Sequence, residues 1–140
     1  MYTELTYTVD EHVGVITLNR TDARNALTHT TYAELEDAVR STSARCLVIT
    51  GADPAFCSGD DVKVIMKAAG EQISSGLRAE PRLTPAADAL LNTDVPVVAA
   101  VNGAAVGWGM ELAVMADIRV AQGRLRDAQP CDVMGRHVGD

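Results

Sequence analysis

A short apolar run between Val95 and Val101 is the stretch around which the chain is organised. It is rich in β-branched side chains, and it lies between Asp94 and the turn-forming pair Asn102-Gly103. An uninterrupted apolar run of this length is typical of a strand that is buried on both faces of a sheet. The pattern therefore predicts a central strand here.

A glycine-rich turn and a helical pattern follow this strand. Gly107 and Gly109 come just before a segment that places Leu112 and Met115 on one stripe, which predicts a helix. The first N–H groups of such a helix have no partner within it and point toward whatever lies at the turn. Glu111 falls in the first turn, and backbone donors beside an acid suit chemistry on a carbonyl group.

The rest of the chain alternates between strand-like and helix-like patterns. Further strands are predicted at Tyr7–Val9, Val13–Leu18, Cys46–Thr50 and Ile118–Ala121. Helices are predicted from about Thr28 to near Ser41–Ser43, at Val62–Ala69 and at Pro85–Leu91. In the first of these helices, Thr31 and Glu34 have the spacing of a capping box.

Alternating strands and helices with short connections predict an α/β fold with mainly parallel strand pairing. Residues 70–82 mix Gly, Ser, Pro and charge, which predicts a mobile loop. After residue 121 the regular pattern decays. We therefore divide the chain into a core at residues 1–121 and a divergent tail at residues 122–140.

Composition narrows the possible functions. Hydrophobic residues make up 47% of the 140 positions and aromatic residues only 4%, so the core must be aliphatic. A formal net charge of -7 argues against a nucleic-acid-binding surface. Three widely spaced cysteines without a CxxC motif favour a reducing compartment over a disulfide framework or a zinc site. No signal peptide or membrane-length apolar run is visible, so we expect a cytoplasmic protein that does not bind a membrane.

Three motifs, in order, resemble those of the enoyl-CoA hydratase/isomerase (crotonase) superfamily. The first is Val13–Leu18 together with Asn19-Arg20 and the run Ala23–Leu27, ARNAL. The second is LVITGADPAFCSGDDVK at Leu47–Lys63, and the third runs from Val95 to Ala121. Three motifs at suitable separations, which cover most of residues 13–121, are far more specific than one glycine pattern.

This resemblance implies a fold and a substrate class. The family fold is a spiral of ββα units, which would be incomplete here at the C-terminus. Family members bind acyl-CoA thioesters, so coenzyme A would enter as part of the substrate, with no separate cofactor and no metal. Self-association is also expected, because family members form trimers or hexamers, although the region that builds trimers is missing from this chain.

The resemblance also implies roles for individual residues. The backbone N–H groups of Asp60 and Trp108 would form an oxyanion hole for the thioester oxygen, and Glu111 would act as a catalytic acid or base. Segments that hold the coenzyme A part of the substrate correspond to Arg24, Asn25, Ala26, Leu27, Ala55, Phe56 and Lys63. The most specific reaction implied is hydration of a 2-enoyl-CoA to a 3-hydroxyacyl-CoA. Isomerase, decarboxylase and hydrolase chemistries share the same oxyanion hole.

One departure from the family pattern favours a second hypothesis. The resemblance stops near Ala121, and no residue beyond it matches the second catalytic glutamate of the hydratases; Asp127 and Asp132 are acidic but lie outside the family context. Truncation or a frameshift would produce such a tail. The alternative to an enzyme is therefore a non-catalytic, truncated chain that binds coenzyme A weakly or only associates with other subunits.

Simpler roles compete with some of these assignments. Glu111 could be an acid placed to interact with the helix dipole, and Lys63 with Lys67 could be a solvated helix face. We expect Asp61 to cap a helix and Cys57 to fill space in the core, since neither has a partner at the spacing of a metal site or a catalytic pair.

Overall fold

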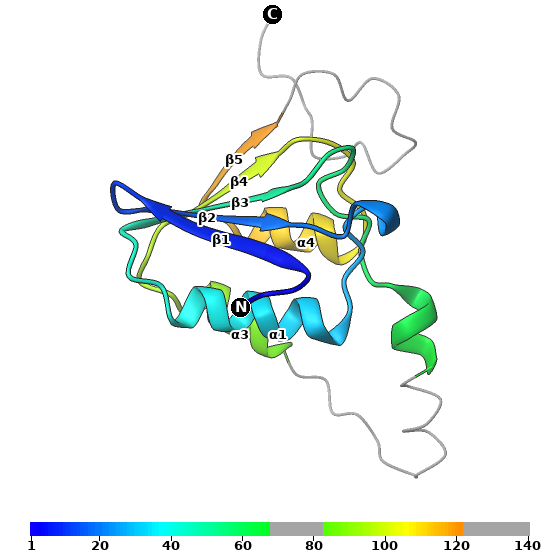
Figure 1. The fold of residues 1–140 in the computed structure, drawn as a ribbon. Helices are drawn as coiled ribbons and strands as arrows, with labels where there is room; N and C mark the ends of the chain where they lie inside the picture. The colour runs from blue at the N-terminus through cyan, green and yellow to red at the C-terminus, as the bar shows by residue number, and fades with distance from the viewer. Residues whose placement is uncertain (68–82, 122–140) are drawn as a thin grey trace, which may run out of the picture.

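The computed structural model describes residues 1–67 and 83–121 (Figure 1). Its elements, in chain order, are β1 (Leu5–Asp10), β2 (Val13–Leu18), the 3₁₀ helix η1 (Thr21–Ala23), α1 (His29–Arg40), β3 (Cys46–Gly51), a helical segment at residues 62–67, α3 (Pro85–Leu91), β4 (Val97–Val101), α4 (Trp108–Met115) and β5 (Ile118–Ala121). The predicted mobile loop at 70–82 and the predicted tail at 122–140 lie outside the described residues.

The five strands form one sheet in the order β1-β2-β3-β4-β5. β1 and β2 pair as an antiparallel hairpin, and every later pairing is parallel. The predicted α/β fold with mainly parallel strands is therefore confirmed. β1 is longer than the predicted strand at 7–9, and β4 begins at Val97 rather than at Val95.

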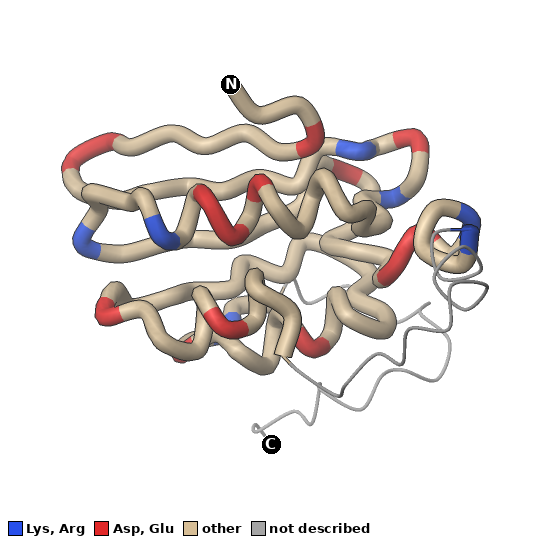
Figure 2. Tube along the Cα trace, turned by 90° about the horizontal axis from the view of Figure 1, so that it is seen from below, with Lys and Arg blue, Asp and Glu red and all other residues tan. Residues whose placement is uncertain are grey.

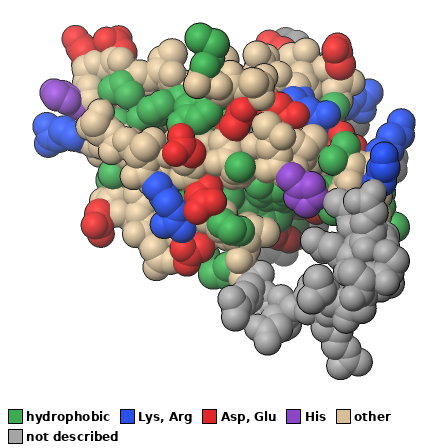
Figure 3. Space-filling model, turned by 60° about the horizontal axis from the view of Figure 1, so that its bottom comes forward, with side chains coloured by type: hydrophobic (Ala, Val, Ile, Leu, Met, Phe, Trp, Pro, Cys, Tyr) green, Lys and Arg blue, Asp and Glu red, His purple; other side chains and the backbone are tan. Residues whose placement is uncertain are grey.

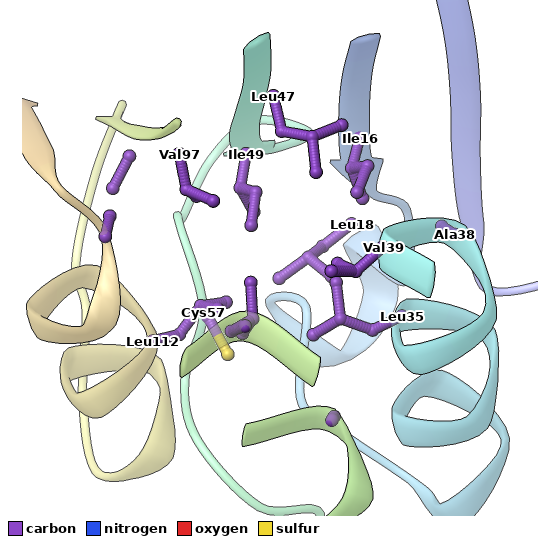
Figure 4. Close-up of a cluster of buried hydrophobic side chains, with 14 of the residues drawn as sticks. Ile16, Leu18, Leu35, Ala38, Val39, Leu47, Ile49, Cys57, Val97 and Leu112 are labelled. Carbon is purple, nitrogen blue, oxygen red and sulfur yellow. The ribbon is translucent and has the colours of Figure 1, made fainter. Parts of the chain in front are cut away.

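The helices α1, α3 and α4 lie on the same side of the sheet and cover one of its faces (Figure 1). Side chains at alternate positions of the strands point into the space between sheet and helices and meet apolar side chains from the helices (Figure 4). The residues labelled there are Ile16, Leu18, Leu35, Ala38, Val39, Leu47, Ile49, Cys57, Val97 and Leu112. Burial of this aliphatic layer is the main contribution to the stability of the fold.

The other face of the sheet is less covered. In β3 and β4 each buried residue alternates with a half-buried one, such as Val48 or Val98. The prediction that the central strand is buried on both faces is therefore wrong for the described part of the chain, because α1, α3 and α4 all lie on the same side of the sheet. At the sheet edge, all four residues of β5 are exposed.

The start of α1 differs from the sequence prediction. Thr28 is the N-cap, and its side chain accepts hydrogen bonds from the N–H groups of Thr30 and Thr31. The side chain of Thr31 accepts from the Thr28 N–H at 3.0 Å, which completes a capping box. The predicted pair of Thr31 and Glu34 is wrong, because Glu34 is turned toward the N-terminal segment.

Glu34 anchors the beginning of the chain to α1. Its carboxylate accepts hydrogen bonds from the N–H groups of Thr3, Glu4 and Leu5 at 2.6, 2.9 and 3.2 Å. Burial alone would raise the pKa of Glu34, but these hydrogen bonds, with one from the Thr3 hydroxyl, outweigh burial and lower it. The ionised carboxylate therefore stabilises the folded state.

The predicted helix at Pro85–Leu91 is confirmed. Its N-cap is Thr84, whose side chain accepts from the Ala87 N–H at 3.2 Å, and Pro85 stands in its first turn. α3 lies beside α1 (Figure 2). An ion pair between Arg40 and Asp88, 2.8 Å long, links the two helices at the surface.

Charge is distributed over the helical side of the molecule rather than concentrated. Acidic and basic side chains are interspersed with hydrophobic ones on the face that Figure 3 shows. Among residues 1–67 and 83–121, the helices are all too short or too polar to span a bilayer.

The Glu34 anchor yields a stability prediction. We expect Glu34→Gln to lower the free energy of unfolding at pH 7 by about 1 kcal/mol, because hydrogen bonds to a charged acceptor are weakened. Since the folded-state pKa of Glu34 is lowered, its contribution is complete above the unfolded pKa of roughly 4.3 and is lost as the pH falls through the folded pKa. The difference from the wild type in urea unfolding should therefore shrink under acid conditions.

Glu36→Gln is the matched control for this prediction. Glu36 lies on the same helix, and its one ion pair with a residue of 1–67 or 83–121 is with the exposed side chain of Arg40. An equal effect of both substitutions, or a Glu34→Gln effect that does not change with pH, would contradict the anchoring role.

Candidate active site

The candidate site forms where the loops after two neighbouring parallel strands meet. The loop that follows β3 contains residues 55–60, and the loop that follows β4 contains residues 102–107. The N–H groups of Phe56 and Cys57 both donate to the Ala104 carbonyl at 3.1 Å, and the Val106 N–H donates to the Cys57 carbonyl at 2.9 Å. These hydrogen bonds hold the two loops side by side.

Two glycines allow the loops to approach this closely. A Cβ added to Gly109 would lie 2.7 Å from the Cβ of Cys57, well inside van der Waals contact. Gly59 has a φ of +87°, and a Cβ there would lie 2.8 Å from the Val106 carbonyl oxygen and 3.5 Å from the Trp108 backbone nitrogen. The segment Gly59-Asp60 is thus in contact with the start of α4.

A third segment supports the first loop from the opposite side. The Leu27 N–H donates to the Gly59 carbonyl, and the Asp61 N–H donates to the Leu27 carbonyl, both at 2.8 Å. Leu27 and Asp60 are therefore bridged in parallel. Because successive N–H groups of an extended chain point to opposite sides, the N–H of Asp60 points away from Leu27.

The start of α4 supplies a second unpaired donor. The N–H groups of Gly109, Met110 and Glu111 donate to the carbonyls of Val106 and Gly107 at 2.9–3.2 Å. The N–H of Trp108 has no acceptor among the described residues, and neither has that of Asp60. The two predicted oxyanion-hole residues thus contribute unpaired donors from two segments that are in contact.

The predicted acid lies on the same helix. Glu111 is exposed in the first turn of α4, three residues after Trp108 and thus on the same helix face. Both side chains line a hollow of about 480 Å³ between α3 and α4. The rest of its wall is mostly apolar and includes Leu91 and Val114.

Tyr32 is a site residue that the sequence analysis missed. Its hydroxyl donates to Oδ1 of Asp60 at 2.6 Å, and its ring meets the Trp108 indole edge-to-face, with centroids 4.8 Å apart at 84°. Burial, and next the hydrogen bond to Asp60, raises the pKa of the phenol, with the charge of Glu111 among the smaller causes. The one sequence signal is its position beside the buried helix stripe, which does not reveal its partners.

Arg20 is a second residue whose role the sequence did not reveal. Its Nη1 donates to Oδ2 of Asp61 at 3.1 Å and to the Ala26 carbonyl at 2.6 Å. Its Nε lies 3.4 Å from a carboxylate oxygen of Glu4. Arg20 thus connects the loop after β3 with the segment that supports it.

The predicted coenzyme A residues fall into two groups. Ala26, Leu27, Ala55 and Phe56 are buried as whole residues, and their backbone groups hydrogen-bond to neighbouring segments, so they shape the loops rather than present side chains to a ligand. Asn25 is 1% exposed, and its amide group donates to the carbonyls of Ala52 and Ala55 at 2.7 and 2.8 Å, which joins two loops.

Arg24 and Lys63 form the other group. Both are exposed: Arg24 lies on the supporting segment, and Lys63 lies on the helical segment that follows the loop after β3. A phosphate can reach both side chains from solvent, and it can also reach the exposed Lys67 on the same helical segment. Among the predicted coenzyme A residues, Arg24 and Lys63 are those for which a charge-based role remains open.

Cys57 is the space-filling core residue that the sequence predicted. Its side chain is fully buried against Gly109. Burial raises the pKa of the thiol to about 11, so it stays protonated at neutral pH.

Within the described ranges, no three His, Cys, Asp or Glu side chains gather as a metal site requires.

Known proteins resemble this chain in sequence and in fold. The enoyl-CoA hydratase/isomerase family matches residues 8–135. The protein named probable enoyl-CoA hydratase EchA14 of Mycobacterium tuberculosis is 39% identical over 127 residues, which are 86% of this chain and 47% of that protein. The mevalonyl-coenzyme A hydratase of Beauveria bassiana is 40% identical over 130 residues, which are 85% of this chain and 46% of that protein.

Solved structures agree with the sequence relatives. An enoyl-CoA hydratase structure from Geobacillus kaustophilus superposes with a TM-score of 0.73 and 32% identity, covering 89% of this chain and 48% of its own. The chain spans about half the length of the relatives that it matches. From the family match, the shared motifs and the common fold, this chain belongs to the enoyl-CoA hydratase/isomerase family.

Proposed function

We propose that this chain contains the oxyanion-binding part of an acyl-CoA enzyme, and that its reaction is the hydration of a 2-enoyl-CoA to a 3-hydroxyacyl-CoA. The observation that carries the proposal is the pair of unpaired N–H groups on Asp60 and Trp108, on segments that are in contact at Gly59. Two fixed donors beside each other fit one oxygen atom on which negative charge develops.

The two donors would act on the thioester. As water adds to C3, the electron pair of the double bond moves toward C2 and the carbonyl, and negative charge develops on the thioester oxygen. Hydrogen bonds from Asp60 and Trp108 would strengthen as this charge grows, so they would stabilise the transition state more than the bound substrate. The partial positive charge at the start of α4 would add to this effect.

Glu111 would handle the proton. Its carboxylate is on the helix that supplies one of the two donors, and it is accessible from the hollow between α3 and α4. As a base it would take a proton from the attacking water, and as an acid it would return one to C2. The apolar wall of the hollow suits an acyl chain.

The coenzyme A part would bind along the segments that flank Asp60. The segments at residues 24–27 and 55–56 would lie along the pantetheine and adenine, while the side chains of Arg24 and Lys63 would meet phosphates. Hydrogen bonds hold these segments against the loop that carries Asp60. They support this arrangement because the segments that would bind coenzyme A are then fixed relative to the N–H groups that would bind the thioester carbonyl.

A non-catalytic role is the second candidate. It is favoured by Glu111 being the one acid proposed for a reaction that both takes a proton from water and gives one to C2. In that case the chain would bind coenzyme A thioesters or associate with other subunits without turnover. Hydration measured as loss of the conjugated-thioester absorbance separates the two candidates.

Glu111→Gln tests the acid–base role. We expect kcat for hydration of a short 2-enoyl-CoA to fall by roughly 10²–10⁴-fold, because a positioned acid or base contributes that much. The control is Glu36→Gln on α1, which should keep wild-type turnover. A wild-type chain that is folded but shows no turnover would support the non-catalytic role, and turnover unaffected by Glu111→Gln would remove Glu111 from the mechanism.

Trp108→Pro tests the oxyanion donor. Proline has no N–H, yet it is well tolerated at the first position of a helix, which is where Trp108 stands. We expect kcat to fall by about 10²–10³-fold, as when one oxyanion-hole donor is lost. Trp108→Ala removes the indole but keeps the N–H, so it should retain much more activity than Trp108→Pro. Equal losses in both variants would show that the side chain, not the N–H, is what matters.

Arg24→Ala and Lys63→Ala test the coenzyme A contacts. Each should raise KM for an enoyl-CoA by up to about 5-fold, since exposed charge pairs are worth about 0.2–1 kcal/mol. Neither should change KM for the corresponding enoyl-pantetheine, which lacks the nucleotide phosphates. An equal rise for both substrates would contradict phosphate binding by these side chains.

A further inference from the structure

Tyr32 contacts both residues of the proposed oxyanion hole. Its hydroxyl donates to the carboxylate of Asp60 at 2.6 Å, and its ring packs edge-to-face on the indole of Trp108. These two residues come from different loops, 48 positions apart in the chain. Tyr32 itself stands on α1, so it joins three elements at one point.

We propose that Tyr32 is a positioning residue that sets the Asp60 and Trp108 N–H groups relative to one another and holds the Asp60 carboxylate away from the oxyanion. This inference rests on the proposed function, because it assigns the two N–H groups to one oxygen. Tyr32 contacts the side chains of the donor residues, so its effect on the reaction is exerted through them.

The negative charge of the Asp60 side chain is the first reason to assign a positioning role to Tyr32. The carboxylate of Asp60 belongs to the same residue as one of the donors, and a negative charge close to a developing oxyanion opposes catalysis. A hydrogen bond to the phenol fixes the direction of this carboxylate. Because burial and the Asp60 contact raise the pKa of Tyr32, the phenol remains a donor across the working pH range.

Hydrogen bonds fix the part of α1 from which Tyr32 projects. It lies next to Thr31 in the first turns of α1, where the capping box of Thr28 and Thr31 fixes the helix. Glu4 accepts hydrogen bonds from both threonine hydroxyls and is also paired with Arg20. Tyr32 therefore projects from a part of α1 that cannot easily shift relative to the loops.

Tyr32→Phe is the test, because it removes the hydroxyl and keeps the ring on Trp108. We expect kcat for a short 2-enoyl-CoA to fall by about 10-fold, since misplacing a reacting group by 1 Å can cost about 10²-fold. KM should change by less than about 2-fold, because hole contacts strengthen mainly in the transition state. The control is Tyr2→Phe, which removes a similar tyrosine–aspartate hydrogen bond, 2.8 Å long, at the surface between side chains that contact neither Asp60 nor Trp108 through a described hydrogen bond.

A double-mutant cycle separates positioning from general damage. In an Asp60→Ala background, which retains the backbone donor, Tyr32→Phe should change kcat by less than about 2-fold, because its partner has gone. Amide chemical shifts of Asp60 and Trp108, measured by NMR without substrate, should move in Tyr32→Phe and stay fixed in Tyr2→Phe. This second measurement does not depend on turnover.

The outcomes distinguish this inference from the proposed function. A lower kcat that disappears in the Asp60→Ala background, together with shifted amides, supports the positioning role. An active wild type in which Tyr32→Phe changes neither kcat nor the two amides overturns it. A folded but inactive wild type overturns the proposed function instead, and the amide shifts then decide whether Tyr32 sets the two N–H groups.

Discussion

The close contact between the loop after β3 and the start of α4 is the constraint on which the site depends. Where the segments meet, Gly109 packs against Cys57, and Gly59 faces the Val106 carbonyl and the Trp108 nitrogen, with no room for a side chain. Hydrogen bonds from three separate segments lock this arrangement. Donors held in this way need no reorganisation when charge develops, and that is the property an oxyanion hole requires.

The sequence predicted the elements of the fold better than their surroundings. Strand and helix periodicity is local, so the runs at 13–18 and 46–50 and the helix at 85–91 could be located from it. Burial of β4 and β5 depends on which elements cover each face of the sheet, and this is set by packing between distant segments. The capping box failed for a similar reason, because Glu34 binds the chain near Thr3, 31 residues away.

The candidate site shows the same difference between local motifs, which the sequence reveals, and contacts between distant residues, which it does not. Asp60, Trp108 and Glu111 stand in contiguous motifs that resemble the family, so they could be identified without coordinates. The links of Tyr32 to Asp60 and of Arg20 to Asp61 join residues 28 and 41 positions apart and have no sequence pattern. Asn25 lies in a recognisable motif, but the motif does not reveal what its amide does: it accepts from the Arg20 N–H and donates to the carbonyls of Ala52 and Ala55, so it braces two loops.

The pair Asp60-Asp61 shows how side chains and backbone divide their tasks at this loop. Two adjacent carboxylates beside an oxyanion hole would oppose the charge that the hole must stabilise. Each is bound by a different donor: Asp60 by the phenol of Tyr32 and Asp61 by the guanidinium of Arg20. Both contacts lie on the C-terminal side of the Asp60 N–H, which has no acceptor among the described residues, whereas the peptide N–H between the two carboxylates, that of Asp61, donates to the Leu27 carbonyl at 2.8 Å. The acidic side chains thus hold the loop in place just beyond the Asp60 N–H, and that N–H is the group proposed to meet the substrate.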